Sequence, residues 1–106
     1  MEKLKGFQKK YLKGLAHAMK PVVFIGRNGI TPNVVQALDE SLEKHELIKL
    51  KFIDFKEKEE KEAIITELEN ATASGHVGMI GHVAIFYRRQ NDPDKRKIVV
   101  PDRSSS

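Results

Sequence analysis

The fold of this chain is constrained most by three consecutive patterns between residues 21 and 55. Residues 22–25 form a continuous apolar run, which is typical of a buried strand. Thr31 and Pro32 then open a helix, because threonine caps a first turn and proline suits the first helical position. Residues 47–55 alternate between apolar residues and lysines, which predicts a half-buried strand. A strand, a helix and a strand in this order cross over right-handed within one sheet.

An amphipathic helix is predicted over residues 4–19, before this unit. At 100° per residue, one side of the helix is apolar and the other side is almost wholly basic. Pro21 ends the helix, because the residue before a proline is driven out of the helical region. The apolar side carries Leu4, Phe7, Tyr11, Leu12, Leu15 and Met19, and the basic side carries Lys3, Lys5, Lys9, Lys10, Lys13, His17 and Lys20.

The second half of the chain predicts one more helix and a hairpin. Residues 58–73 form a helix pattern with acidic residues in its first turns, where the helix dipole favours them, and Gly75 is the expected stop. Residues 77–80 and 83–87 read as strands on either side of Gly81-His82. Glycine at the first position of a two-residue loop indicates a type II′ hairpin.

Together these elements predict an α/β fold in a single compact domain, with the order α-β-α-β-α-β-β. A chain of 106 residues supports one hydrophobic core, and we assign residues 1–101 to the domain and residues 102–106 to a flexible tail. The sheet should be small, mixed and four-stranded, with helices mainly on one face. Its other face should be partly open, with Lys49 and Lys51 pointing outward.

Charge is segregated along the chain in a way that the net charge of +4 hides. Residues 1–53 hold 10 Lys and Arg against 5 Asp and Glu, residues 54–75 hold 3 against 7, and residues 76–106 hold 6 against 3. Two basic segments on either side of an acidic one predict a polarised surface with one binding face. The alternative is a set of charged faces that only keep the protein soluble.

Composition also excludes several classes of protein. The chain has no Cys, so disulfides and thiolate metal sites are excluded, which is compatible with a reducing cytoplasm. The lysines near the start are not followed by the apolar stretch of a signal peptide, and no segment approaches the ~20 apolar residues of a membrane span. We therefore expect a soluble cytoplasmic protein that does not bind membranes.

The turn Gly26-Arg27-Asn28-Gly29 lies between the first predicted strand and the helix that begins at Thr31. Glycines at both ends allow positive φ and a close approach of the backbone to a ligand. The Arg27 guanidinium and the first amides of the helix both favour an anion, and in a basic protein that anion is expected to be a phosphate. The alternative is an ordinary turn, because Asn-Gly is a common turn dipeptide.

Catalysis and metal binding are the weaker interpretations of the four histidines. His17, His45, His76 and His82 could supply an acid and a base for RNA cleavage, but no paired spacing, H-x-E element or nucleophile elbow accompanies them. His76 and His82 could bind a metal across the hairpin, but no third ligand is evident. We expect a non-catalytic protein without metal or cofactor.

Six motifs add a more specific indication. They are Leu12-Lys13-Gly14-Leu15-Ala16-His17, Lys20-Pro21-Val22-Val23, Gly26-Arg27-Asn28-Gly29-Ile30-Thr31, His45-Glu46-Leu47-Ile48-Lys49, Ile80-Gly81 and Phe86-Tyr87-Arg88. In this order and spacing, over about residues 7–101, they resemble the bacterial YhbY family of stand-alone CRM domains. The resemblance implies an RNA-binding domain similar in fold to the C-terminal domain of bacterial translation initiation factor three. It also implies association with precursors of the large ribosomal subunit.

The resemblance assigns the family's G-x-x-G loop, by position, to residues 26–29. Tyr87 either stacks on a base or belongs to the core, whereas alternation puts Phe86 in the core with Val77, Met79 and Ala84. His82 stands where relatives often have lysine, and we do not count it as a site residue. The expected RNA-binding residues are Gly26, Arg27, Asn28, Gly29, Lys9, Lys13, Lys20, Lys49, Lys51, Tyr87, Arg88 and Arg89.

The function expected from the residues and the resemblance is non-catalytic RNA binding in assembly of the large ribosomal subunit. The partner would be ribosomal RNA in pre-ribosomal particles, bound by a monomer chiefly through phosphates, with no small-molecule substrate. The alternative is a protein-interaction module that docks on a ribosomal protein or translation factor, because a lysine-rich face also suits an acidic partner.

Overall fold

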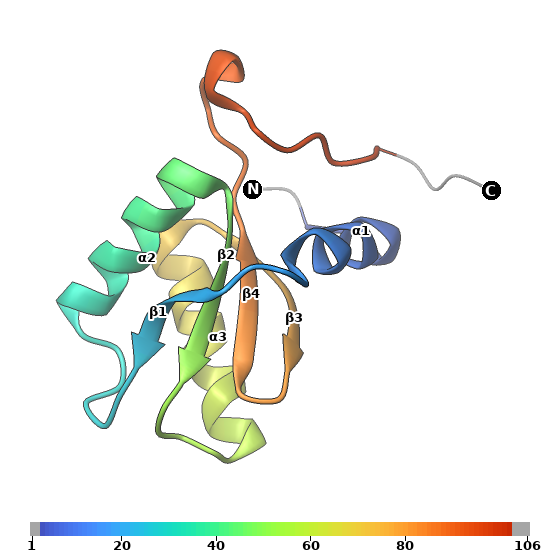
Figure 1. Cartoon of the computed structure of the whole chain (residues 1–106). Helices are drawn as coiled ribbons and strands as arrows, with labels where there is room; N and C mark the ends of the chain where they lie inside the picture. The colour runs from blue at the N-terminus through green and yellow to red at the C-terminus, as the bar shows by residue number, and fades with distance from the viewer. Residues whose placement is uncertain (1–2, 103–106) are drawn as a thin grey trace.

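The computed structural model describes residues 3–102, and its elements follow one another in the predicted order (Figure 1). A short 3₁₀ helix, η1 (Pro93–Lys95), follows them. The helices are α1 (Gly6–Ala16), α2 (Pro32–His45) and α3 (Lys58–Thr72), and the strands are β1 (Pro21–Ile25), β2 (Leu47–Phe52), β3 (Gly75–Ile80) and β4 (Val83–Tyr87).

One mixed sheet contains all four strands, in the order β1-β2-β4-β3. The strands β1 and β2 are parallel, whereas β4 is antiparallel to both β2 and β3. A parallel pair needs a crossover connection, which α2 supplies, whereas the antiparallel strands β3 and β4 are joined by a two-residue loop. The predicted small, mixed, four-stranded sheet is therefore confirmed.

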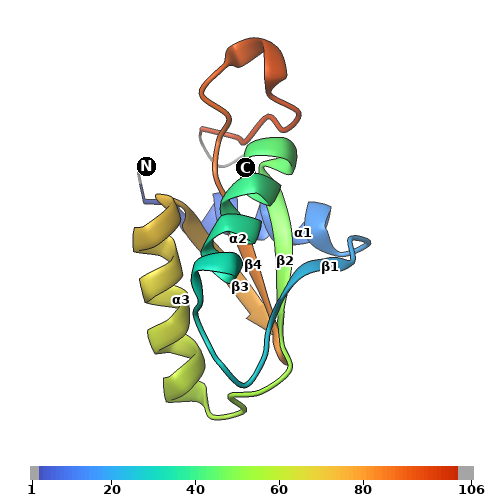
Figure 2. The same ribbon diagram turned by 90° about the vertical axis from the view of Figure 1, so that its left-hand side faces the viewer.

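Helices α2 and α3 cover one face of the sheet, here called the back face, and enclose the larger core. Figure 2 shows these two helices on one side of the strands and α1 on the other. Helices α2 and α3 pack on this face because their apolar stripes meet the inward side chains of the strands. The buried residues are Val23, Ile25, Ile48, Leu50, Phe52, Ala84 and Phe86 from the strands and Leu38, Leu42, Ile65 and Leu68 from the helices.

Helix α1 covers only part of the opposite face, called the front face. Leu12 and Ala16 are fully buried there against the sheet, whereas Tyr11 and Leu15 each remain 42% exposed. The helix is also shorter than the predicted range 4–19. The apolar stripe predicted for α1 was therefore too wide, because a helix that lies on a sheet buries only the residues directly facing it.

The helix ends agree with the sequence for α2 and differ for α3. The hydroxyl of Thr31 accepts the Val34 N–H at 3.2 Å, as an N-cap does. Helix α3 ends at Thr72 and is capped by Ala73, which has a left-handed backbone with φ of +52°, and Gly75 instead begins β3. The expectation that Gly75 stops this helix was wrong, because Ala73 adopts the terminating conformation that glycine usually supplies.

A bulge in β3 changes which side chains share a face. The register with β4 shifts between His76 and Gly78, so Val77 packs in the front core while Met79 packs in the back core. The prediction that Val77 and Met79 share one core was wrong, because the extra residue of the bulge reverses which side chains point to which face of the sheet. Phe86 is fully buried in the back core, as predicted. Gly81 alone in the hairpin loop has positive φ, +60°, which fits the predicted type II′ turn.

A single buried carboxylate organises the segment after β4. Glu46 follows α2 with φ of +64° and is 1% exposed. Its Oε2 accepts the Gln90 N–H at 2.9 Å, and its Oε1 accepts the N–H groups of Lys97 at 2.6 Å and Ile98 at 3.0 Å. The Glu46 carboxylate thus accepts hydrogen bonds from three backbone N–H groups that lie far from it in the sequence.

The segment held by Glu46 then returns to α1 on the front face. Ile98 and Val100 pack against the core under α1, and the Pro101 carbonyl accepts the Gln8 amide at 2.9 Å. Figure 1 shows this segment extending toward α1. Ile98, Val100 and Pro101 therefore contact the part of the domain around α1. The end of the domain at residue 101 stays a prediction, and the predicted tail lies outside the described residues except for Asp102.

Replacing Glu46 with alanine should lower the free energy of unfolding by about 3 kcal/mol, because three backbone amides lose the buried carboxylate that accepts their hydrogen bonds. Glu46→Gln keeps one oxygen acceptor and should cost less. Urea denaturation followed by circular dichroism measures both values. The matched control is Glu40→Ala, since Glu40 lies exposed on α2 and accepts a hydrogen bond from the Gln36 side chain. Equal losses for Glu46→Ala and Glu40→Ala would contradict the role of Glu46.

Candidate nucleic-acid interface

The loop at residues 26–29 is a tight turn between β1 and α2. The Gly29 N–H donates to the Gly26 carbonyl at 3.0 Å, and Gly29 has φ of +65° beside the Phe55 ring. The expected positive φ is thus confirmed at Gly29 but was wrong at Gly26. A Cβ at Gly26 would have nothing within 4 Å, so the backbone there is open to a ligand.

Both side chains at the tip of this loop face solvent. Arg27 and Asn28 are exposed, and Arg27 pairs with no carboxylate among residues 3–102. The guanidinium is a planar cation that carries five N–H donors. It is therefore available for an anion at the start of α2, whose N-terminus has the same electrostatic preference.

Three connecting loops meet at one end of the sheet, here called the loop end: residues 26–29, residues 53–57 and the hairpin turn at Gly81-His82. The Phe52 N–H donates to the His82 carbonyl and the Ile53 N–H donates to the Ile25 carbonyl, both at 2.8 Å. Figures 1 and 2 both place these loops at the bottom of the molecule. The loop end thus brings Arg27 to the same part of the fold as the hairpin.

A row of side chains crosses the open half of the front face, next to the loop end. Phe24 pairs with Lys51, Lys51 with Val83, and Val83 with Ile80 in successive strands, so all four point to the same side. Phe24 is 52% and Ile80 is 56% exposed. The run at residues 22–25 was expected to be buried throughout, but α1 does not extend over this half, so Phe24 and Val22 lie at the surface (Figure 1).

Lys49 and Lys51 both lie on the front face, but only Lys51 faces solvent freely. The Lys49 ammonium donates to the carbonyls of His17 at 3.2 Å and Met19 at 3.0 Å. It therefore satisfies carbonyl groups just after α1 and ties that segment to β2. The expectation that both lysines are outward and open holds for Lys51 only.

The basic residues of the first helix lie farther from the loop end. Lys13 lies over Gly78 of β3, where a Cβ would collide with the lysine stem. Lys9 is half-buried, and Lys20 is exposed directly before β1. These residues border the front face beside α1 and do not surround the 26–29 loop.

Two residues at the end of β4 have structural surroundings that the sequence did not reveal. Tyr87 is 3% exposed under α1, so its ring has no free face for a base; burial, followed by the charge of Glu46, raises the pKa of its hydroxyl above 10. The Arg88 side chain is 17% exposed and donates to the Asp39 carboxylate at 2.6 Å and the Thr72 carbonyl at 2.8 Å.

Arg88 therefore joins the two back-face helices. Its second terminal nitrogen donates to the Asp39 carbonyl at 3.0 Å and to Glu43 at 3.2 Å. The prediction that Tyr87 and Arg88 contact RNA conflicts with this geometry. The ring of Tyr87 is covered by the protein, and the terminal nitrogens of Arg88 already donate hydrogen bonds within it. Arg89 is exposed at the end of the sheet opposite the loop end, where RNA contact remains a prediction.

The hairpin turn brings a histidine and a buried lysine together. The Lys61 ammonium of α3 lies 2.5 Å from His82 Nδ1 and must be the donor, because it has no lone pair. The charge of Lys61 is the largest of the effects that lower the pKa of His82 below 6.5, followed by desolvation and by Lys56 and Lys51. The sequence did not indicate that Lys61 would be buried or that it would contact His82.

The described residues contain neither a cluster of metal ligands nor a helix that could span a membrane. Among residues 3–102, no group of three or more His, Cys, Asp or Glu side chains converges on one point. Within the same range, none of the helices has the length and apolar character to cross a bilayer. His76 lies in β3 and its backbone N–H donates to Glu69 of α3; burial above all lowers the pKa of its side chain.

Comparison with known proteins gives the family. Residues 4–88 match the CRS1/YhbY (CRM) domain. A Haemophilus influenzae protein named "RNA-binding protein" is 39% identical over 94 residues, which cover 89% of this chain and 91% of that protein. A Pseudomonas aeruginosa protein named "Probable RNA-binding protein PA4753" is 38% identical over 88 residues, which cover 83% of this chain and 84% of the other.

A solved structure agrees in fold as well as in sequence. The solution structure of the hypothetical protein SAV1595 from Staphylococcus aureus, described as "a putative RNA binding protein", superposes with a TM-score of 0.77 at 34% identity. The match covers 92% of this chain and 99% of that one. These matches confirm the expected family and agree with the expectation of a non-catalytic protein. The chain belongs to the CRS1/YhbY family of CRM-domain proteins.

Proposed function

We propose that this protein binds RNA through the loop end and the open half of the front face. The proposal rests on exposed cationic side chains that lie near an exposed aromatic ring. Arg27 stands at the tip of the 26–29 loop, and Lys51 pairs with Phe24 on the adjacent strand. The names of the relatives, which are called RNA-binding proteins, support the same conclusion.

Arg27 and the backbone at Gly26 would contact phosphate groups. Because Arg27 has no carboxylate partner in the described part of the chain, it breaks no ion pair there when it binds phosphate. The backbone at Gly26 lets a phosphate approach closely because nothing occupies the place of a side chain. Lys51 adds a second charge on the sheet, and Lys13 and Lys20 extend the basic surface toward α1.

Phe24 would add contact with an unpaired base. Phe24 is 52% exposed and pairs across the strands with Lys51. Aromatic rings on open sheet surfaces stack on bases that are not paired within a duplex, and a neighbouring lysine can bind the adjoining phosphate. The proposed ligand is therefore structured RNA with at least one accessible unpaired base.

We further propose that the RNA is ribosomal RNA in precursors of the large subunit, which is what the family resemblance implies. An interface that uses phosphates and one stacked base recognises shape and accessibility rather than a long sequence. Such recognition suits a folded ribosomal RNA, where single-stranded elements lie within a rigid framework.

Changing Arg27 to alanine should weaken RNA binding several-fold and reduce the slope of log affinity against log salt by about one, because one phosphate contact is lost. Fluorescence anisotropy with a labelled ribosomal RNA fragment at several salt concentrations measures both quantities. In cells, crosslinking should map the wild-type protein to large-subunit precursor RNA, with fewer crosslinks for Arg27→Ala.

Lys44→Ala is the matched control for charge, because Lys44 is exposed in the last turn of α2, at the other end of the sheet. Its salt slope should equal that of the wild type. A wild-type slope for Arg27→Ala, or an equal loss for Lys44→Ala, would argue against contact at the loop. Crosslinks confined to other RNA classes would contradict the ribosomal assignment.

Changing Phe24 to leucine should weaken binding of RNA with unpaired bases by about tenfold, because stacking contributes about 1–3 kcal/mol per base. The salt slope should stay unchanged, since no charge is removed. Phe24→Tyr retains a stacking ring and should bind like the wild type. If the leucine and tyrosine variants bind equally well, Phe24 does not act as a stacking platform.

A further inference from the structure

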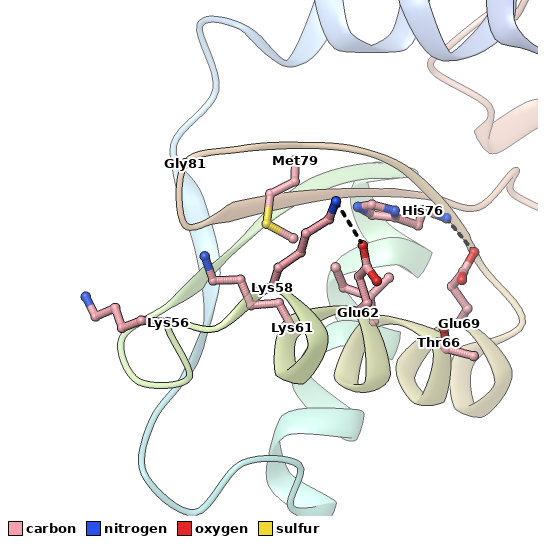
Figure 3. Close-up of a pocket in the computed structure, with 10 residues that line it drawn as sticks. Lys56, Lys58, Lys61, Glu62, Thr66, Glu69, His76, Met79 and Gly81 are labelled. Carbon is pink, nitrogen blue, oxygen red and sulfur yellow. Dashed lines mark hydrogen bonds and ion pairs between the residues drawn. The ribbon is translucent and has the colours of Figure 1, made fainter.

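A cleft of about 530 Å³ lies between α3 and the β3–β4 hairpin, away from the open front face. Figure 3 shows its lining, with Lys56 and Lys61 toward Gly81, Lys58 beside Glu62, and Glu69 and His76 toward the other end. Ile65 and Met79 also line it. The charged groups at the hairpin end are therefore Lys56 and Lys61.

Lys61 is the unusual member of this group, because it is a lysine that is 6% exposed. Among residues 3–102 it forms no ion pair with a carboxylate, and its only side-chain hydrogen-bond partner is His82 Nδ1, at 2.5 Å. Buried cations are normally paired with an anion, because removing an ammonium group from water is costly. Here a neutral imidazole stands where an anion is expected.

Carboxylates that line the cleft do not neutralise its hairpin end. Glu62 lies 4.0 Å from the Lys58 ammonium, and both side chains are well exposed, so this pair is weak and screened by solvent. Glu69 accepts the His76 backbone N–H at 2.8 Å, toward the opposite end. Lys56 and Lys61 therefore leave an excess of positive charge beside the hairpin turn.

The Lys61–His82 pair has the chemistry to accept a phosphate. Neutral His82 accepts a hydrogen bond from Lys61 and so shields the ammonium while the cleft is free. A phosphate beside Lys61 would replace that acceptor, and His82 could then take up a proton and donate to the same anion. The charged groups that bear on His82 are Lys61 from α3, Lys56 from the loop before it and Lys51 from β2; all are cationic, so an arriving anion favours that protonation.

We propose that the hairpin end of this cleft binds a phosphate group of the RNA backbone, with Lys61 and His82 as the contacting residues. The RNA part of this inference rests on the proposed function. The cleft opens beside the loop end, since Phe52 binds the His82 carbonyl and Ile53 binds that of Ile25. An RNA strand bound at Arg27 could thus continue around the hairpin to Lys61.

The first experiment titrates the full chain with inorganic phosphate at constant ionic strength and follows the His82 ring by NMR. In the absence of phosphate His82 should titrate below pH 6.5, and phosphate should raise that pKa by about one unit. Lys61→Met keeps the buried stem and removes the charge. In this variant the pKa of free His82 should move up toward 6.5 and respond far less to phosphate.

Two further variants keep the test decisive. Lys44→Met removes an exposed charge at the other end of the sheet and should respond to phosphate like the wild type. His82→Asn suits the hairpin turn and serves if Lys61→Met fails to fold; its Gly81 amide shifts with phosphate should be several-fold smaller than in the wild type. A His82 pKa that phosphate does not change in the wild type, or equal responses in Lys61→Met and the wild type, would overturn the site.

The second experiment measures the salt dependence of binding to a single-stranded oligoribonucleotide. Lys61→Met should reduce the slope by about one, and Lys44→Met should not. Suppose that phosphate shifts the His82 pKa in the wild type but Lys61→Met keeps the wild-type salt dependence of RNA binding. The cleft would then bind free phosphate only. This result would overturn the assignment of the phosphate to RNA and leave the proposed function intact. Failure of the wild type to bind any RNA would refute the proposed function and the RNA assignment together, while the phosphate titration would still decide whether the site exists.

Discussion

The structure depends most on the central strand β2, because both hydrophobic cores meet at it. Ile48, Leu50 and Phe52 are buried under α2 and α3, while Leu47 is buried under α1. Since alternate residues of a strand point to opposite faces, a shift of one residue in the register would exchange the two sets. The pairing of β2 with β1 and β4 therefore fixes where Lys51 lies and which half of the front face is left open.

The distribution of internal acceptors decides which basic side chains remain available for a ligand. Arg88 is held by Asp39, Glu43 and the Thr72 carbonyl, and Lys49 is held by carbonyl groups just after α1. Within residues 3–102, Arg27 has no such carboxylate partner, and the side chain of Lys61 is hydrogen-bonded only to the neutral imidazole of His82. Charge counted along the sequence treats these four cations alike, although only some of them can bind an external anion without breaking a contact within the protein.

Local patterns predicted the elements and most of their ends, because capping, proline and periodicity act over a few neighbouring residues. Thr31 and Pro32 fixed the start of α2, and Gly81 fixed the hairpin turn. Predictions that needed knowledge of distant neighbours were less accurate. The bulge at residues 76–78 separated Val77 from Met79, Ala73 ended α3 in place of Gly75, and Tyr87 proved to be covered by α1. The hydrogen bonds of Glu46 join residues more than forty positions apart, and no local sequence pattern predicts them.

By itself, the sequence determined the order of elements, the mixed sheet, the tight 26–29 turn and membership of a family, because these depend on short patterns and on ordered motifs. Only the tertiary structure decided which surfaces are free. It covered Tyr87, engaged Arg88 and Lys49, exposed Phe24, and set Lys61 against His82. The physical reason is that exposure and pairing are properties of neighbours brought together by folding, and the distances between those neighbours are not encoded in any one segment of the chain.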